Sequence, residues 1–248
     1  MVRKVRTMLN FRDVQEAPVK KLRNVPLNLV LSRLIRDKPG LIGASITGAQ
    51  QTGKSSYALM VMYELYEHNV DAVLENTVFT IEQLTEKISY ALENKERLPC
   101  ILWDDSSVHG GAGMYNIARS LVQCLSALGD TMGLATKGIL LTSPSGDLIK
   151  AFRNYNFYRV QIAVGRHKFD RVARGYEFGR SPFDQRWGRS AFVDKFDTRI
   201  PFYSQYYKLR EELSISVVRN MRDMLVHPEE KPFAFFEKGG KKYVEYDL

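Results

Sequence analysis

The sequence has little of what disulfide-linked, zinc-bound or membrane-spanning proteins need. Its 248 residues include only two cysteines, Cys100 and Cys124, both in apolar stretches, and four histidines without ligand spacing. No apolar run approaches the roughly 18 residues of a membrane-spanning helix. The basic first residues also lack the apolar stretch of a signal peptide. We therefore expect a soluble, cytoplasmic protein with no transmembrane segment and no structural metal.

Glycine and proline are also modest, at 17 and 9 residues. With 44% hydrophobic and 11% aromatic residues, the composition excludes collagen-like, coiled-coil and disordered chains. The length suits one larger domain, or one with a small appendage.

The charge of +8 is unevenly distributed. Residues 1–40 carry ten Lys and Arg against three Asp and Glu, and residues 150–199 carry twelve against five. Residues 41–149 carry six against twelve, while residues 200–248 balance at eight and eight. An acidic core between two basic stretches predicts a polyanionic partner, nucleic acid or an acidic membrane surface. The alternative is a solvated basic surface.

In the second basic stretch, arginines and aromatic residues alternate. Such a pattern is typical of a surface that holds phosphates and stacks bases. It is equally typical of strands with one apolar face and one arginine-rich face. Both interpretations stay open at this stage.

Apolar and amphipathic runs alternate along the first two thirds of the chain. We expect helices over residues 26–37, 54–69, 80–94, 116–129 and 148–153, and strands over residues 41–47, 71–79, 99–103, 138–143 and 158–164. The helix at residue 80 starts with the spacing of a capping box. Strands that are apolar throughout predict an α/β fold with a mostly parallel central sheet flanked by helices.

The pattern changes toward the C-terminus. Residues 169–200 predict antiparallel strands with turns at residues 180–182 and 187–188, followed by a long helix over 203–225 and a hairpin over 233–246. We therefore expect a C-terminal antiparallel strand extension and helix. The predicted parts are a basic arm and helix (1–40), a P-loop core (41–165) and a basic aromatic strand region with helix and hairpin (166–248).

One motif carries chemistry. Residues 48–55, GAQQTGKS, match the phosphate-binding P-loop pattern G-x-x-x-x-G-K-[ST] between a strand and a helix. Its backbone N–H groups can curl around a phosphate at the positive end of the helix. Lys54 would reach the β- and γ-phosphates and the Ser55 hydroxyl would bind Mg²⁺. The expected nucleotide-binding residues are Gly48, Gln51, Thr52, Gly53, Lys54, Ser55 and Ser56.

Polar residues follow two later strands. Asp104 and Asp105 end the run CILWDD; we expect Asp104 to order Mg²⁺ with Ser55, and Asp105 to activate the attacking water. Thr142 or Ser143 would sense the γ-phosphate, with residues 71–79 supplying a strand between the P-loop strand and the acidic strand. The alternatives are cap and turn residues at ordinary strand ends.

These motifs, GAQQTGKS, ILWDDSS and ILLTSPSGDLIKAFRNY, resemble the RecA/AAA-type ATPases. More narrowly, the chain looks like the small, DnaA-like ATPases of archaeal viruses and plasmids over residues 40–225. The resemblance implies ATP and Mg²⁺ as cofactors and ATP hydrolysis coupled to DNA handling in a mobile element, with replication initiation or helicase loading ahead of genome packaging.

We expect the basic segments 1–40 and 150–199 to meet DNA or the next subunit of a homo-oligomer, with a replication or packaging protein as a further partner. An arginine finger would come from among Arg119, Arg153, Arg159 and Arg166. The alternative for each of them is an ordinary surface arginine. Two other functions compete with a DNA-coupled ATPase. One is a nucleotide or small-molecule kinase with residues 166–189 as its lid, and the other is a nucleotide-gated interaction protein with little turnover.

Overall fold

A computed structural model describes residues 29–106, 131–144, 156–180, 186–212, 215, 233–238 and 241–246. Its helices are α1 (Val30–Asp37), α2 (Lys54–Leu65), α3 (Val70–Glu75) and α4 (Ile81–Glu93). Its strands are β1 (Ile42–Thr47), β2 (Thr77–Val78), β3 (Ile101–Trp103), β4 (Gly138–Ser143), β5 (Asn156–Val164), β6 (Asp170–Arg180), β7 (Arg186–Asp197), β8 (Phe233–Lys238) and β9 (Lys241–Tyr246). Residues 131–135 are also helical, as are residues 203–212, which are called the C-terminal helix below.

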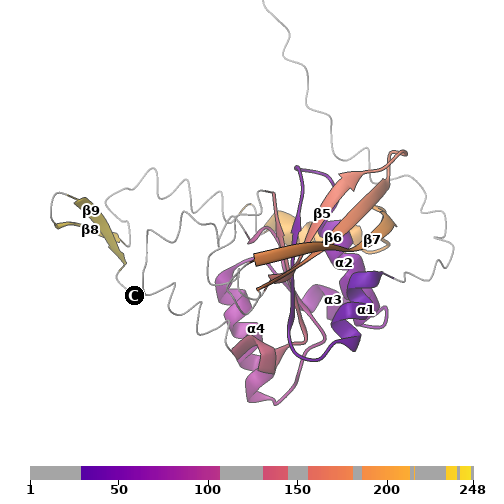
Figure 1. Ribbon diagram of the computed structural model, residues 1–248. Coiled ribbons are helices and arrows are strands. Elements are labelled where there is room, and N and C mark those ends of the chain that lie inside the picture. Colours follow the sequence, from indigo (N-terminus) through magenta and orange to yellow (C-terminus); the bar gives the residue numbers. More distant parts are fainter. Residues whose placement is uncertain are drawn as a thin grey trace, which may run out of the picture.

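A seven-stranded sheet forms the centre of the molecule, in the order β2-β3-β4-β1-β5-β6-β7 (Figure 1). The strands from β2 to β5 pair in parallel, whereas β6 and β7 continue the sheet in antiparallel pairs. The predicted fold class is confirmed: a mostly parallel α/β sheet flanked by helices, with an antiparallel extension. Strands β8 and β9 form the separate predicted hairpin.

The parallel strands β1 and β4 end at the same level, and β3 ends two residues before them. β1 pairs with β4 from Ile42 opposite Gly138 to Thr47 opposite Ser143, and Trp103 of β3 lies opposite Leu141. Since carboxyl ends of parallel strands meet at one edge of the sheet, the loops that leave β1, β3 and β4 are brought together there. This edge is where the sequence places its polar motifs.

The core has two halves, one on each face of the sheet. Alternate residues of β3 and β4 point to opposite faces, so Leu102 and Leu140 pack with α1, α2 and the inner side of β5–β7. Ile139 and Leu141 instead pack under α4 in the second half of the core. Figure 1 shows α1 and α2 apart from α4 across the sheet.

The expected strand over residues 71–79 was wrong. Residues 70–75 form α3, because the Asn69 side chain caps the helix by accepting from the N–H of Ala72 at 3.2 Å. Only the two residues of β2 are extended, and they lie at the edge of the sheet. The strand between β1 and β3 is therefore β4, which comes after both acidic residues in the chain.

Two expected helix boundaries and one expected turn also differ from the structure. α1 begins at Val30 rather than Pro26, since Leu29 is extended with ψ 134°. α2 ends at Leu65 rather than Asn69, because Glu67 and His68 have positive φ angles of 51° and 68°. Gly188 forms no turn; it pairs with Phe178 inside β7, where a Cβ would lie 2.8 Å from the Phe178 ring.

The predicted start of the helix at residue 80 was confirmed. α4 carries the predicted capping box, in which Thr80 and Gln83 bond each other's backbone N–H groups. The C-terminal helix is described only to residue 212, with residue 215 helical beyond it. Outside the described residues lie the loop at 109–113, the helices at 116–129 and 148–153, and Cys124. The three-part domain division stays a prediction, and its boundary at residue 165 falls between the hydrogen-bonded strands β5 and β6.

Candidate nucleotide site

The P-loop curls between the end of β1 and the start of α2. Two of its glycines stand where a side chain would collide. At Gly48, with φ 154°, a Cβ would lie 2.9 Å from Thr52 Oγ1 and 3.0 Å from the carbonyl oxygen of Ile162. At Gly53, with φ 94°, it would lie 2.8 Å from a methyl group of Thr198. The motif glycines are therefore required by close approach and by left-handed backbone.

Lys54 lies beneath this loop at the first turn of α2 and is 8% exposed. Its ammonium donates to the carbonyl oxygens of Gly48 at 3.1 Å and Ala49 at 2.7 Å. Burial lowers the pKa of Lys54, and the charges of Asp105 and Asp104 oppose that shift. The cation is thus held where the loop would wrap an anion.

The other predicted P-loop residues follow the turn of the chain. Gln51 is exposed with φ 61°, and the Thr52 hydroxyl donates to the Ala49 carbonyl oxygen at 2.8 Å. Ser56 is buried within the first turn of α2. Arg171, which the sequence did not single out, donates from Nε to the Thr52 carbonyl oxygen at 2.9 Å and so ties β6 to the loop.

Ser55 and Asp104 meet, although 49 positions separate them. The Ser55 hydroxyl donates to Asp104 Oδ1 at 2.8 Å, and Asp104 is fully buried at the end of β3. Because the hydroxyl hydrogen points at the carboxylate, the hydroxyl oxygen keeps lone pairs for a metal ion. An oxygen-only pair fits Mg²⁺, a hard cation that is usually held by one or two carboxylates together with substrate phosphates.

Thr142 touches both aspartates from the neighbouring strand. Its hydroxyl donates to Asp104 Oδ1 at 2.5 Å and accepts from the backbone N–H of Asp105 at 2.8 Å. Ser143, the last residue of β4, is fully buried. The structure therefore brings Thr142 to the acidic pair, a contact that the sequence did not predict, and its role toward a phosphate stays a prediction.

Asp105 follows Asp104 in left-handed backbone, with φ 50°. Its side chain is 31% exposed. Burial and the neighbouring Asp104 raise the pKa of Asp105, while Arg210 and Lys54 oppose the shift. Non-glycine residues in this conformation are uncommon and are found often at functional sites.

Two further site residues come from the C-terminal helix. The Tyr206 hydroxyl donates to Asp104 Oδ2, and the Arg210 guanidinium forms an ion pair with Asp105. Neither residue was among the site residues predicted from the sequence. Their only signal was a spacing of four residues, which places them on one face of a helix.

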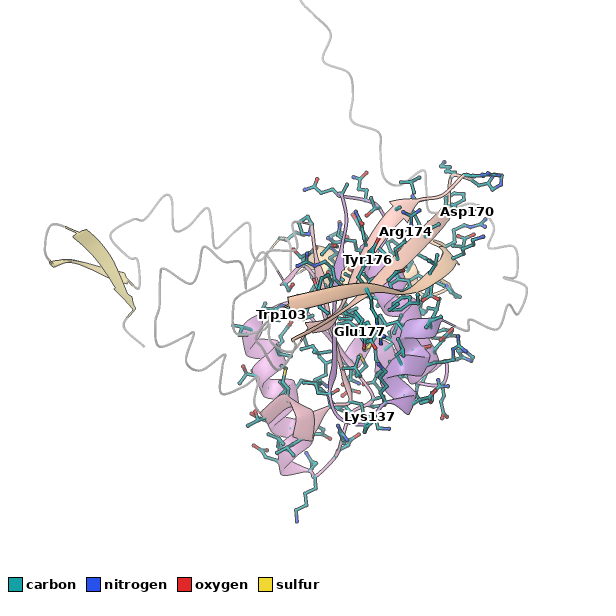
Figure 2. All side chains as sticks on the ribbon, in the orientation of Figure 1. Trp103, Lys137, Asp170, Arg174, Tyr176 and Glu177 are labelled. Carbon is teal, nitrogen blue, oxygen red and sulfur yellow. The ribbon has the colours of Figure 1, made fainter. Side chains whose placement is uncertain are left out.

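A second surface lies on the outer side of β5–β7. On the inner side, Tyr158, Phe192 and Phe196 are buried in the core. The open face is made of Arg159, Gln161, Arg174, Tyr176, Phe178, Val193 and Lys195. The Arg159 guanidinium lies 5.5 Å over the Phe178 ring, and Arg174 and Tyr176 lie along β6 (Figure 2). The strands thus have the predicted apolar and arginine-rich faces, and two aromatics stand among the cations.

Of the four arginines named as finger candidates, Arg159 belongs to this open face and Arg166 is exposed after β5. Arg119 and Arg153 lie outside the described residues.

Within the described part of the chain, no group of three or more His, Cys, Asp and Glu side chains is placed to hold a metal ion. In the same part, no helix has the length and apolar character needed to cross a membrane.

Comparison with protein-family models gives no match. Among curated proteins, the chain resembles an uncharacterized protein of Acidianus two-tailed virus, with 31% identity over 116 residues. That match covers 44% of this chain and about 40% of the length of the viral protein.

Three solved structures have similar folds at low identity. The N-terminal domain of zonular occludens toxin from Neisseria meningitidis is 14% identical with a TM-score of 0.37, over 62% of this chain and 95% of that one. FlaH, a flagellar accessory protein from Methanocaldococcus jannaschii, is 13% identical with a TM-score of 0.34, over 60% and 84%. A KaiC-like protein from Pyrococcus horikoshii is 12% identical with a TM-score of 0.30, over 61% and 89%.

Proposed function

We propose that this protein binds Mg-ATP and hydrolyses it. The observation that carries the proposal is the contact of the P-loop hydroxyl of Ser55 with the buried carboxylate of Asp104, beside Lys54. A phosphate-binding loop, a buried cation and an oxygen pair suited to Mg²⁺ converge at one edge of the sheet. Such a site supports phosphoryl chemistry by positioning and charge stabilisation.

Each residue has a proposed part. The backbone of residues 48–54 wraps the phosphates and Lys54 neutralises them. Ser55 and Asp104 hold Mg²⁺, which when bound supplies positive charge against the phosphate oxygens. Asp105 takes the proton of the attacking water, and Thr142 or Ser143 senses the γ-phosphate.

The proposed use of this energy is DNA handling in a mobile element, of the replication-initiation or helicase-loading type. The open face of β5–β7 supports it, because Arg174 and Lys195 can pair with phosphates and Phe178 can stack a base. The viral relative fits a mobile element, although it names no activity. The basic segment 1–40, an arginine finger from a second copy, and a replication partner inside the host cell complete this proposal. Genome packaging is the alternative process.

The deciding experiment measures ATP turnover without DNA and with single- or double-stranded DNA. We expect DNA to raise turnover, and Lys54→Ala and Asp105→Asn to abolish it. Lys87→Ala, which removes an ion pair with Glu75 and a contact with the Tyr90 ring on α4, is the matched control and should turn over ATP like the wild type. Wild-type ATP turnover in Lys54→Ala would refute the proposal that this P-loop is the site of hydrolysis.

A separate pair of variants tests the DNA surface. Arg174→Gln with Lys195→Gln should weaken DNA binding and flatten its dependence on salt, because fewer counterions are released. ATP turnover without DNA should not change, since both residues lie on the face of β6 and β7 opposite the one that packs with α2. Unchanged DNA binding would remove the open face from the proposal.

A nucleotide-gated interaction protein is the second candidate function. It is favoured by one observation: Tyr206 and Arg210 already bond the acidic pair within the protein. Tight ATP binding with negligible turnover, unmoved by DNA, would replace the ATPase with this switch. Transfer of phosphate to a small acceptor, without DNA stimulation, would instead indicate a kinase.

A further inference from the structure

The C-terminal helix reaches the acidic pair from about a hundred residues further along the chain. Tyr206 and Arg210 lie four residues apart, on one face of this helix. Each contacts a different member of the pair: the Tyr206 hydroxyl donates to Asp104 Oδ2, and the Arg210 guanidinium pairs with Asp105 Oδ2. Two side chains that lie one helical turn apart therefore contact the carboxylates of two consecutive residues.

The contact with Asp104 is built into the core. Tyr206 and Asp104 are both fully buried, and the Tyr206 ring lies 6.1 Å from Phe79 at an angle of 23°. Within this packing, the Tyr206 hydroxyl donates to Asp104 Oδ2. With Ser55 and Thr142 on Oδ1, this hydroxyl gives Asp104 a donor on each carboxylate oxygen.

The contact with Asp105 orients a side chain whose backbone is already held. Its left-handed φ of 50° and its N–H bond to Thr142 fix the main chain. The side-chain rotamer is a separate choice among staggered wells. Arg210 selects one of them through a charge-assisted bond, and its side chain is 34% exposed, so part of this bond is shielded from water.

We propose that Tyr206 and Arg210 are positioning residues of the nucleotide site. They hold the carboxylates of Asp104 and Asp105 in the orientation that metal binding and water activation need. The inference rests on the proposed ATPase and makes the C-terminal helix part of its working site.

Turnover of conservative variants tests this role. Tyr206→Phe removes one oxygen, and we expect a kcat about tenfold lower; Arg210→Gln should lower kcat about a hundredfold, with partial recovery in Arg210→Lys. The KM for ATP should stay within about twofold, because the P-loop contacts remain. Tyr207→Phe and Lys208→Gln likewise remove one phenol oxygen and one positive charge next to these residues in the helix, and they should retain wild-type kcat. A kcat that is unchanged or raised in Tyr206→Phe and Arg210→Gln would overturn the proposal, as would a change confined to KM.

A second measurement needs no nucleotide. Urea midpoints of Arg210→Gln, Asp105→Asn and the double variant give the coupling of the two side chains. We expect the double variant to lose clearly less than the two single losses combined; additive losses would overturn the contact. If Arg210→Gln does not fold, the kcat of Tyr206→Phe tests the positioning role by itself. If the wild type hydrolyses no ATP, the proposed function fails, while the coupling still tests the contact.

Discussion

Replacing Thr142 with valine removes one oxygen from the centre of the site while keeping the shape of the side chain. The hydroxyl has two partners: it donates to Asp104 Oδ1 at 2.5 Å and accepts from the N–H of Asp105 at 2.8 Å. Thr142 is fully buried, so water cannot replace either bond in the variant.

The loss can be estimated from these two bonds. A hydrogen bond to a charged group contributes about 1.5–3 kcal/mol, and a buried N–H left without an acceptor costs about 1–3 kcal/mol. Both bonds use the Thr142 hydroxyl oxygen, so their contributions do not simply add. We expect Thr142→Val to lower the free energy of unfolding by about 3 kcal/mol. For a chain of this size, that corresponds to a Tm about 6–12 °C lower.

Thr142→Ser is the matched control, because it keeps the hydroxyl and loses only a methyl group, at a cost of about 1 kcal/mol. Urea and thermal unfolding of the nucleotide-free protein measure both variants. Equal losses in the two variants would refute the role given to the hydroxyl, as would a Thr142→Val protein as stable as the wild type.

Two further predictions concern the packing between β6 and β7 and at the end of α2. In Gly175→Ala, the new Cβ would lie 2.2 Å from the ring of Phe192, so thermal unfolding should show a loss of about 3 kcal/mol; Phe192→Leu in the same chain should restore part of it, and a stable single variant would contradict the packing. Burial raises the pKa of Glu64 above its ordinary 4.5, against hydrogen bonds from Ser32 and the N–H of Leu29. Because the folded-state pKa is the higher one, Glu64 favours folding at low pH and this contribution is lost as pH rises through the raised pKa. The stability of the wild type relative to Glu64→Gln should therefore fall from pH 4.5 to neutral pH, and a constant difference in urea unfolding would contradict it.

The sequence alone determined the features that depend on neighbouring residues. The P-loop between strand and helix, the capping box at Thr80 and the strand over 138–143 were all predicted from local spacing. So were the acidic pair after a buried strand and the mostly parallel sheet, because apolar runs bounded by turn residues have few other solutions. The prediction failed at residues 71–79, where the capping side chain of Asn69 outweighed a β-type run.

Only the tertiary structure decided which distant residues share the site. Strand order placed β4 between β1 and β3 and so brought Thr142 onto the aspartates, although the sequence suggested another strand there. Tyr206 lies 102 positions after Asp104, and nothing in their local sequence encodes the contact. Local propensity and spacing act over a few residues, whereas packing of the C-terminal helix against the end of the sheet depends on the whole fold. For that reason the sequence predicted the P-loop, and the fold identified which side chains contact the acidic pair.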